Sequence, residues 1–71
     1  MTTTFRACYF VAANGQGDLC LTSEDQAHLT DAELVAAAVA EARDAGLIGD
    51  DEHQVSESAL RDGLRIGDYT R

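Results

Sequence analysis

The first 22 residues contain two segments typical of β-strands. TTFRACYFVAA, residues 3–13, is rich in β-branched and aromatic residues, and DLCLT, residues 18–22, shows an alternating pattern of apolar and polar side chains. Between them, NGQG supplies the glycines and the asparagine of a turn. The pattern therefore predicts a β-hairpin.

The register of this hairpin decides which side chains share a face. Pairing Ala13 with Asp18 gives two apolar cross-strand pairs, Phe10 with Leu21 and Ala12 with Leu19. In this register, and in the one that turns at Asn14-Gly15, Cys8 and Cys20 point to opposite faces, so geometry disfavours a disulfide between them. A three-residue loop would reverse this. We expect two free thiols.

Residues 30–45 carry the clearest helical signal. Thr30 and Glu33 have the spacing of a capping box, and the glycine at 46 is suited to the left-handed conformation that ends a helix. A helix is therefore predicted from Asp31 to Ala45. One of its sides is apolar and should pack on the sheet: Leu34, Val35, Ala38, Val39, Ala42 and Ala45.

A second, shorter helix is predicted near Glu57 to Asp62, with Ser56 as its N-cap and Gly63 at its end. The alternative is a hairpin that turns at Asp62-Gly63. The tail LRIGDYTR favours neither a third strand nor an irregular end. The chain is thus expected to be one α+β domain, residues 1–71, with a β-hairpin or a three-stranded antiparallel sheet packed on one main helix.

Composition narrows the classes of function. Thirteen acidic residues face five basic ones, for a net charge of −8, so direct binding to nucleic acid is not expected. No apolar run approaches the roughly 20 residues of a membrane span, and the N-terminus lacks a basic region followed by an apolar one. We expect a soluble protein of the cytoplasm.

The residues capable of catalysis form no recognisable constellation. Cys8 or Cys20 could be combined on paper with His28 or His53 as nucleophile and base, but nothing in their spacing supports this. Both cysteines lie in predicted strands, where a buried and inert thiol is the usual outcome. We expect no catalytic residues, no cofactor and no enzyme.

The segment GDDEHQ, residues 49–54, is the densest cluster of acidic groups. DDEHQVSESALR does not match the template of a calcium loop, and His53 has no histidine three or four residues away, so no metal site is predicted. The cluster is either a solvated loop between helices or an acidic surface for a basic partner.

The hairpin is apolar on both faces, whereas only one long helix is available to cover it. If that helix covers Phe10, Leu19 and Leu21, the other face is left over. ALRDGLRI could fold over this second face, or a second copy or a different protein could cover it. The residues of this face that could bind a partner or form a dimer are Phe5, Tyr9 and Val11, beside Ala7 and Cys20.

A short acidic chain with a hairpin, one main helix and a surplus of carboxylates resembles the small inhibitor proteins of bacteriophages, the anti-CRISPR proteins in particular. The opening MTTTF is similar to the start of at least one such inhibitor. The resemblance is one of general build and transfers no functional residue. It implies a cytoplasmic protein that binds a basic surface of a bacterial defence complex, where nucleic acid would otherwise lie.

Carboxylates on a rigid scaffold present negative charge much as phosphates do, which gives this expectation a physical basis. We therefore predict a partner-binding acidic surface made of Glu33, Glu41, Asp44, Asp50, Asp51 and Glu52. The alternatives are a small enzyme or metal-binding protein, and a homodimeric adaptor. Monomer and homodimer both stay open.

Overall fold

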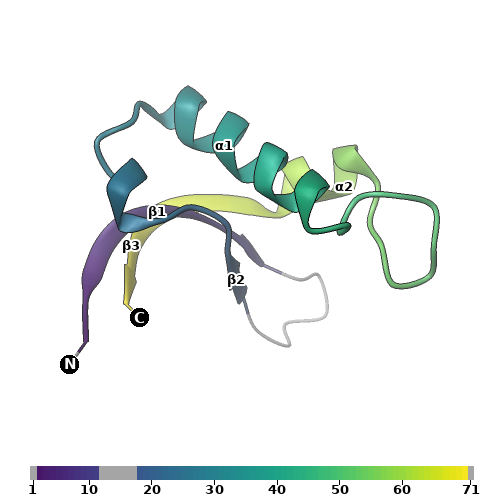
Figure 1. Ribbon diagram of the computed structural model, residues 1–71, viewed down its shortest axis with the longest axis horizontal. Coiled ribbons are helices and arrows are strands. Elements are labelled where there is room, and N and C mark those ends of the chain that lie inside the picture. The colour runs from purple at the N-terminus through teal and green to yellow at the C-terminus, as the bar shows by residue number, and fades with distance from the viewer. Residues whose placement is uncertain (1, 12–17, 71) are drawn as a thin grey trace.

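The computed structural model describes residues 2–11 and 18–70 as a three-stranded antiparallel sheet with two helices on one side (Figure 1). The strands are β1 (Thr4–Val11), β2 (Asp18–Cys20) and β3 (Leu64–Thr70), in the order β2-β1-β3. The helices are α1 (Asp31–Asp44) and α2 (Glu57–Gly63), and a short 3₁₀ turn, η1 (Glu24–Gln26), precedes α1. The predicted α+β class, with its main helix and second short helix, is confirmed, and the sheet has three strands.

Both ends of helix α1 carry the capping interactions that the local sequence predicts. The Thr30 hydroxyl accepts a hydrogen bond from the Glu33 amide at 3.2 Å, and the Glu33 carboxylate accepts one from the Thr30 amide at 3.0 Å. At the other end, Gly46 has a φ of 76°, and the amide of Leu47 donates to the carbonyl of Ala42 at 2.9 Å. This is the hydrogen-bonding pattern of a Schellman motif. The helix ends one residue before the predicted boundary.

The C-terminal third of the chain forms a helix and then, without a connecting loop, a strand. The Ser56 hydroxyl caps α2 by accepting from the Ala59 amide at 3.2 Å, and β3 begins directly after Gly63. The alternative hairpin at Asp62-Gly63 does not form. Strand β3 pairs with β1 along its whole length. Residues 64–70, whose conformation the sequence left open, therefore form the third strand.

The predicted hairpin register is wrong by two residues. Phe10 lies opposite Leu19 and not opposite Leu21, and Val11 lies opposite Asp18. This is the alternative register that turns at Asn14-Gly15, although residues 12–17, which include Ala12, Ala13 and the NGQG turn, lie outside the described residues. The shift places Leu21 opposite Cys8, where the Leu21 amide donates to the Cys8 carbonyl at 3.0 Å.

Strand β2 ends at Cys20, earlier than predicted, because the next hydrogen bond from β1 goes to a side chain and not to the backbone. The Cys8 amide donates to the hydroxyl of Thr22 at 2.9 Å, so Thr22 replaces the backbone carbonyl that a longer strand would supply. Thr22 is buried although it is polar. Its hydrogen bond offsets the cost of removing the hydroxyl from water.

The hydrophobic core lies between the sheet and the two helices. Leu34 of α1, Leu60 of α2 and Cys8 of β1 are the largest side chains that are fully buried. Of the six residues predicted for the apolar side of α1, four are buried, while Val35 is half-buried and Ala45 is exposed. The alanines allow α1 to approach the sheet closely. The remaining core residues are Leu21, Ala38, Val39, Ala42 and Leu64.

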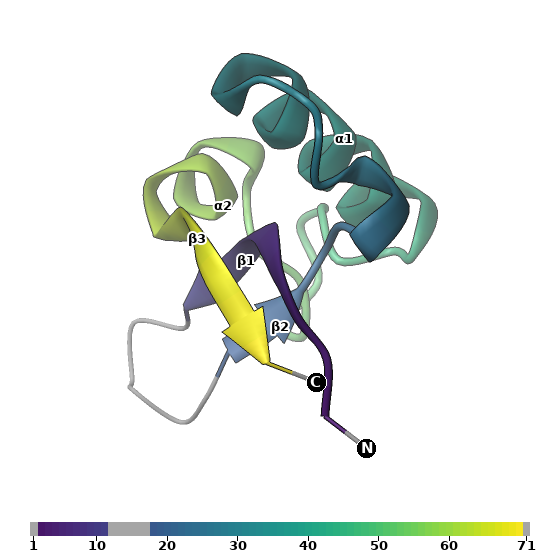
Figure 2. The ribbon, with the colours of Figure 1, turned by 90° about the vertical axis from the view of Figure 1, so that its left-hand side faces the viewer.

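Within residues 2–11 and 18–70, both helices lie on one face of the sheet and none lies on the second face (Figure 2). Figure 1 shows the strands arching away from α1 and α2, and Figure 2 shows both helices above the sheet and neither below it. ALRDGLRI therefore does not fold over this face: its first part belongs to α2 and its last part extends the sheet as β3. The expectation that α1 covers Leu19 is also wrong, since Leu19 on the short edge strand is 44% exposed.

Candidate functional site: an acidic loop beside the helix end

The acidic segment 49–54 lies in a loop that joins α1 to α2 and projects from one end of the molecule (Figure 1). The base of the loop is closed by backbone hydrogen bonds between its two sides. The Val55 amide donates to the Leu47 carbonyl at 2.8 Å, and the Gly49 amide donates to the Val55 carbonyl at 3.1 Å. Ile48 and Val55 also pack against the hydrophobic core, which anchors both sides of the loop.

Within the loop, the side chain of Gln54 forms a brace. Its amide nitrogen donates to the Gly46 carbonyl at 2.9 Å, and its amide oxygen accepts from the Asp51 amide at 3.1 Å. The backbone amide of Gln54 donates in turn to the Asp51 carbonyl at 3.0 Å. The side chain of Gln54 thus connects Gly46, just after α1, to Asp51 in the acidic turn.

Gly49 provides the space for this brace. A β-carbon at residue 49 would collide with the side-chain amide of Gln54. The sequence pattern indicated no role for Gly49 or Gln54. The one sign of their role in the sequence was their position: Gly49 and Gln54 flank the four consecutive polar residues DDEH.

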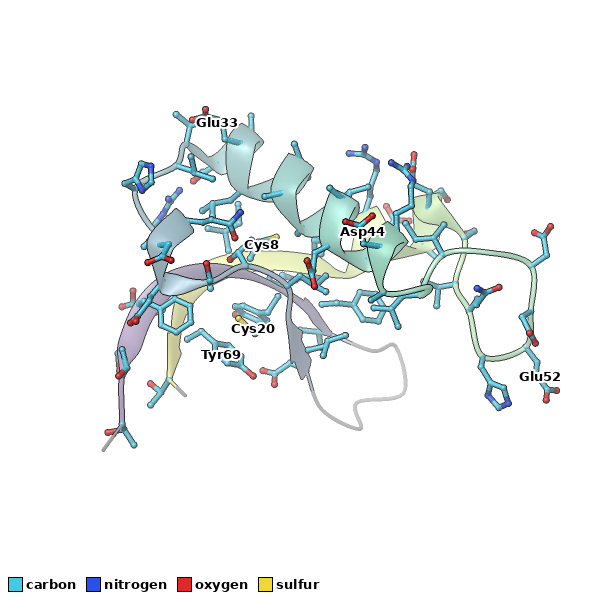
Figure 3. All side chains as sticks on the ribbon, viewed as in Figure 1. Cys8, Cys20, Glu33, Asp44, Glu52 and Tyr69 are labelled. Carbon is cyan, nitrogen blue, oxygen red and sulfur yellow. The ribbon has the colours of Figure 1, made fainter. Side chains whose placement is uncertain are left out.

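The three carboxylates of the loop are all exposed. Asp50, Asp51 and Glu52 point into solvent, and Figure 3 shows Glu52 at the outer end of the loop. The Glu52 carboxylate lies 3.3 Å from the imidazole of His53, which is itself exposed and pairs with it when protonated. In the ranges 2–11 and 18–70, no group of three or more His, Cys, Asp or Glu side chains is arranged to hold a metal ion.

Glu33 does not join these carboxylates. It lies in the first turn of α1, eleven residues before Asp44, which corresponds to about 16 Å along the helix axis. Figure 3 shows the two residues at opposite ends of α1. The hydrogen bond from the Thr30 backbone amide, followed by the contribution of the Thr30 hydroxyl, lowers the pKa of the Glu33 carboxyl. Its role in the structure is to cap the helix.

Glu41 and Asp44 lie near the C-terminal end of α1, three residues apart and therefore on the same side of the helix. Both are exposed. Glu41 also lines a pocket of about 240 Å³. Together with the loop they form what we call the acidic end: Glu41, Asp44, Asp50, Asp51 and Glu52.

Three of the described arginines pair with carboxylates outside the acidic end, and Arg65 donates to the backbone carbonyls of Asp62 and Leu64. Arg6 of β1 forms an ion pair with Asp31, and Arg43 of α1 forms one with Glu57. Arg61 also contacts Glu57, at 3.7 Å. Among the described residues, therefore, no arginine forms an ion pair with a carboxylate of the acidic end.

The two cysteines are free thiols on opposite faces of the sheet. Cys8 pairs with Ile66 on the helix side and is buried, whereas Cys20 lies opposite Tyr9 on the uncovered face, and its thiol donates to the Thr22 carbonyl at 3.0 Å. Burial, and to a lesser extent the nearby Cys20, raises the pKa of the Cys8 thiol. Cys8 is therefore protonated at neutral pH, which makes it a poor nucleophile.

The uncovered face holds the second predicted set of site residues. Phe5 is buried on this face, and the ring of Tyr69 from β3 lies beside it, with ring centroids 6.3 Å apart. Tyr69 also contacts Tyr9, at 5.6 Å. Val11 is more exposed, at 37%. Tyr69 could not be placed on this face from the sequence, because the tail LRIGDYTR favoured neither a third strand nor an irregular end.

Comparison with known proteins finds no matching family model, and no match among the curated proteins or the solved structures. Within the described residues, no helix is long and apolar enough to cross a membrane.

Proposed function

We propose that this protein is a non-enzymatic inhibitor that binds a basic, nucleic-acid-binding surface of a bacterial defence complex through its acidic end. The resemblance to phage-encoded anti-CRISPR proteins suggests the class of partner and an action in the bacterial cytoplasm. The observation that carries the proposal is the separation of charge. Arg6 pairs with Asp31, and Arg43 and Arg61 pair with Glu57. The carboxylates of the acidic end face solvent, three of them on the braced loop and two on α1.

Preorganisation makes such a surface an effective ligand. The Gln54 brace and the closed base of the loop hold Asp50, Asp51 and Glu52 outward before any partner arrives. The loop then loses less conformational entropy on binding than a flexible acidic tail would lose. Closely spaced carboxylates also compete with phosphates for the same arginines and lysines.

The main test is binding to purified CRISPR effector complexes, measured with and without target DNA. We expect rapid association that competes with DNA and weakens steeply between about 50 and 300 mM salt, because exposed charges are screened over roughly 10 Å at 0.1 M. Reversal of the loop carboxylates, by Asp50→Lys, Asp51→Lys and Glu52→Lys together, should abolish binding.

A second triple variant controls for net charge. Glu24→Lys, Asp25→Lys and Asp62→Lys changes the charge by the same amount at exposed positions away from the loop. This control should still bind. Equal loss in both variants would show a dependence on overall charge alone, and binding by the loop variant would contradict the proposal.

Stoichiometry separates the inhibitor from a small enzyme. A binding inhibitor acts only at about one copy per partner site, whereas an enzyme that modifies the partner acts at far lower ratios and leaves a change in mass. Complete inhibition at one-hundredth of the partner concentration would refute the proposal. Stoichiometric metal in protein purified without chelator would favour the metal-binding alternative.

A further inference from the structure

A pocket of about 240 Å³ is formed by three parts of the chain: the end of β2 with the residues that follow it, the 3₁₀ turn η1, and the C-terminal half of α1. Cofactors and drug-sized ligands occupy pockets of about 300–1,000 Å³, so this smaller one is suited to a single side chain. Its lining residues are Cys20, Leu21, Thr22, Ser23, Gln26 and Glu41.

The wall of the pocket that follows β2 is held in place by hydrogen bonds of its own. Thr22 is buried, its hydroxyl accepts from the Cys8 amide at 2.9 Å, and its carbonyl accepts from the Cys20 thiol at 3.0 Å. The Ser23 amide donates to the side-chain oxygen of Gln26 at 3.0 Å, and the Gln26 amide donates to the Ser23 carbonyl at 3.0 Å. This wall is therefore formed before a ligand arrives, which lowers the entropic cost of binding.

Glu41 is the only charged residue among the described residues that line the pocket. Ala38 and Ala42, its neighbours on α1, are buried, so Glu41 lies at the border of the side that faces the sheet. The Glu41 carboxylate forms no ion pair and no hydrogen bond with the residues of 2–11 and 18–70. Asp44 adds a second negative charge on the same side of the helix, one turn away. The charge of the pocket therefore favours a cation.

We infer that this pocket binds the guanidinium group of an arginine from the basic partner, with the Glu41 carboxylate as its counter-charge. The origin of the arginine rests on the proposed function, whereas the preference for a guanidinium does not. A guanidinium is planar and donates two parallel hydrogen bonds to one carboxylate, which the ammonium group of lysine cannot do. Leu21 provides an apolar wall for the methylene groups of the arginine.

Gln26 favours an arginine within a polypeptide over a free guanidinium compound. Its side-chain oxygen accepts from the Ser23 amide, whereas its side-chain nitrogen has no hydrogen-bond partner in the part of the chain that the structure describes. This nitrogen donates only to an acceptor such as a carbonyl oxygen, which a guanidinium lacks and a polypeptide backbone supplies. An arginine with its backbone therefore satisfies both Glu41 and Gln26.

An NMR titration with N-acetyl-arginine N-methylamide tests the pocket without any protein partner. The backbone amide signals of residues 21–26 and 41 should shift and saturate, with a dissociation constant on the order of 10 mM. Butylammonium at the same concentrations controls for ionic strength and should give smaller shifts that do not saturate. Equal binding of butylammonium, or shifts spread evenly over all exposed carboxylates, would overturn the guanidinium site. Ethylguanidinium lacks the carbonyls and should bind more weakly; equally tight binding would overturn the assignment to a polypeptide.

Two variants of equal charge test the role of Glu41. Glu41→Gln keeps the size of the side chain but removes its charge, so it should weaken binding of the arginine probe about tenfold. Asp44→Asn removes the same charge one turn away and should change binding by less than about threefold. Both residues are exposed, so both variants should fold, which their NMR spectra show directly. Equal effects of the two variants would mean that general negative charge attracts the probe, and would overturn the inference.

The same two variants connect the pocket with the partner when their binding to the defence complex is measured. Glu41→Gln should weaken this association about tenfold and Asp44→Asn less than about threefold. If the probe binds but no defence complex does, the proposed function is refuted and the guanidinium site is retained. If a complex binds and Glu41→Gln has no greater effect than Asp44→Asn, the arginine of the partner does not occupy the pocket and the inference is refuted.

Discussion

The side-chain amide of Gln54 lies directly over the α-carbon of Gly49, so that the two ends of the acidic segment are in contact. The amide is held there by its hydrogen bonds to Gly46 and Asp51. The four residues between these ends therefore form a defined turn. This contact makes the acidic loop part of the folded structure.

Gly49→Ala is expected to displace Gln54 and open the loop. The new methyl group and the brace cannot occupy the same space, so the hydrogen bonds to Gly46 and Asp51 should be lost at a cost of about 1–3 kcal/mol. Urea denaturation measures the cost, and faster hydrogen exchange at the Asp51 amide locates it. Asp50→Ala, at an exposed position of the same loop, should stay within about 0.5 kcal/mol of the wild type. An equal effect of both variants would contradict the brace.

Thr30→Ala should destabilise the protein by about 1 kcal/mol, because the Glu33 amide loses the hydroxyl that caps it. Thermal denaturation at neutral pH measures this loss. Thr30→Ser keeps the hydroxyl and should restore most of the stability. A Thr30→Ser variant as unstable as the alanine variant would show that the methyl group, and not the cap, is responsible.

The lowered pKa of the Glu33 carboxyl should make the free energy of unfolding depend on pH in the acidic range. Its pKa is lowered in the folded state, mainly by the hydrogen bond from the Thr30 amide, so the folded protein binds this proton less readily than the unfolded chain. The stabilisation is present above the ordinary pKa of 4.5 and is lost as the pH falls through the lower folded value. Glu33→Gln cannot titrate, so its denaturation midpoint should fall less over this acidic range.

The two thiols should differ in reactivity. Cys20 is half-buried on the uncovered face, whereas Cys8 is buried and has a raised pKa, so an alkylating reagent should modify Cys20 first. Cys8 should react only as fast as the protein unfolds. Because the folded pKa of Cys8 lies above its ordinary value of 9.0, its contribution to stability is complete below that pH and is lost as the pH rises through the folded value. Rapid labelling of Cys8 at neutral pH would contradict its burial.

Leu60→Ala should cost about 2–5 kcal/mol, which is a large part of the stability of a domain this small. Leu60 is fully buried and is the only residue of α2 in the core. Leu19→Ala removes the same atoms from a side chain that is 44% exposed, and its smaller effect provides the control. Denaturant titration of both variants gives the comparison. Similar losses would mean that α2 is not anchored through Leu60.

The helix boundaries were predictable because their signals are short-range. The Thr30–Glu33 box, the glycine at 46 and the Ser56 cap each satisfy backbone groups within a few residues, so the chain needs no distant partner to define them. The hairpin register was not predictable in the same way. A slip of two residues leaves every side chain on its original face, so the alternating pattern cannot distinguish the two registers. Contacts of Leu21 and Thr22 with Cys8 distinguish them in the fold.

For the candidate site too, some features could be predicted from the sequence and others only from the fold. The sequence by itself determined the excess of acidic residues, their position after the main helix and the two-sided apolar character of β1. The separation of Glu33 from the acidic end follows from its distance along the predicted helix, whereas only the tertiary structure placed Gln54 over Gly49 and brought Tyr69 beside Phe5. A helical wheel gives the angle of a residue around the axis but not its distance along it. Loop braces and strand pairs join residues whose chemistry becomes complementary only after the chain has brought them together.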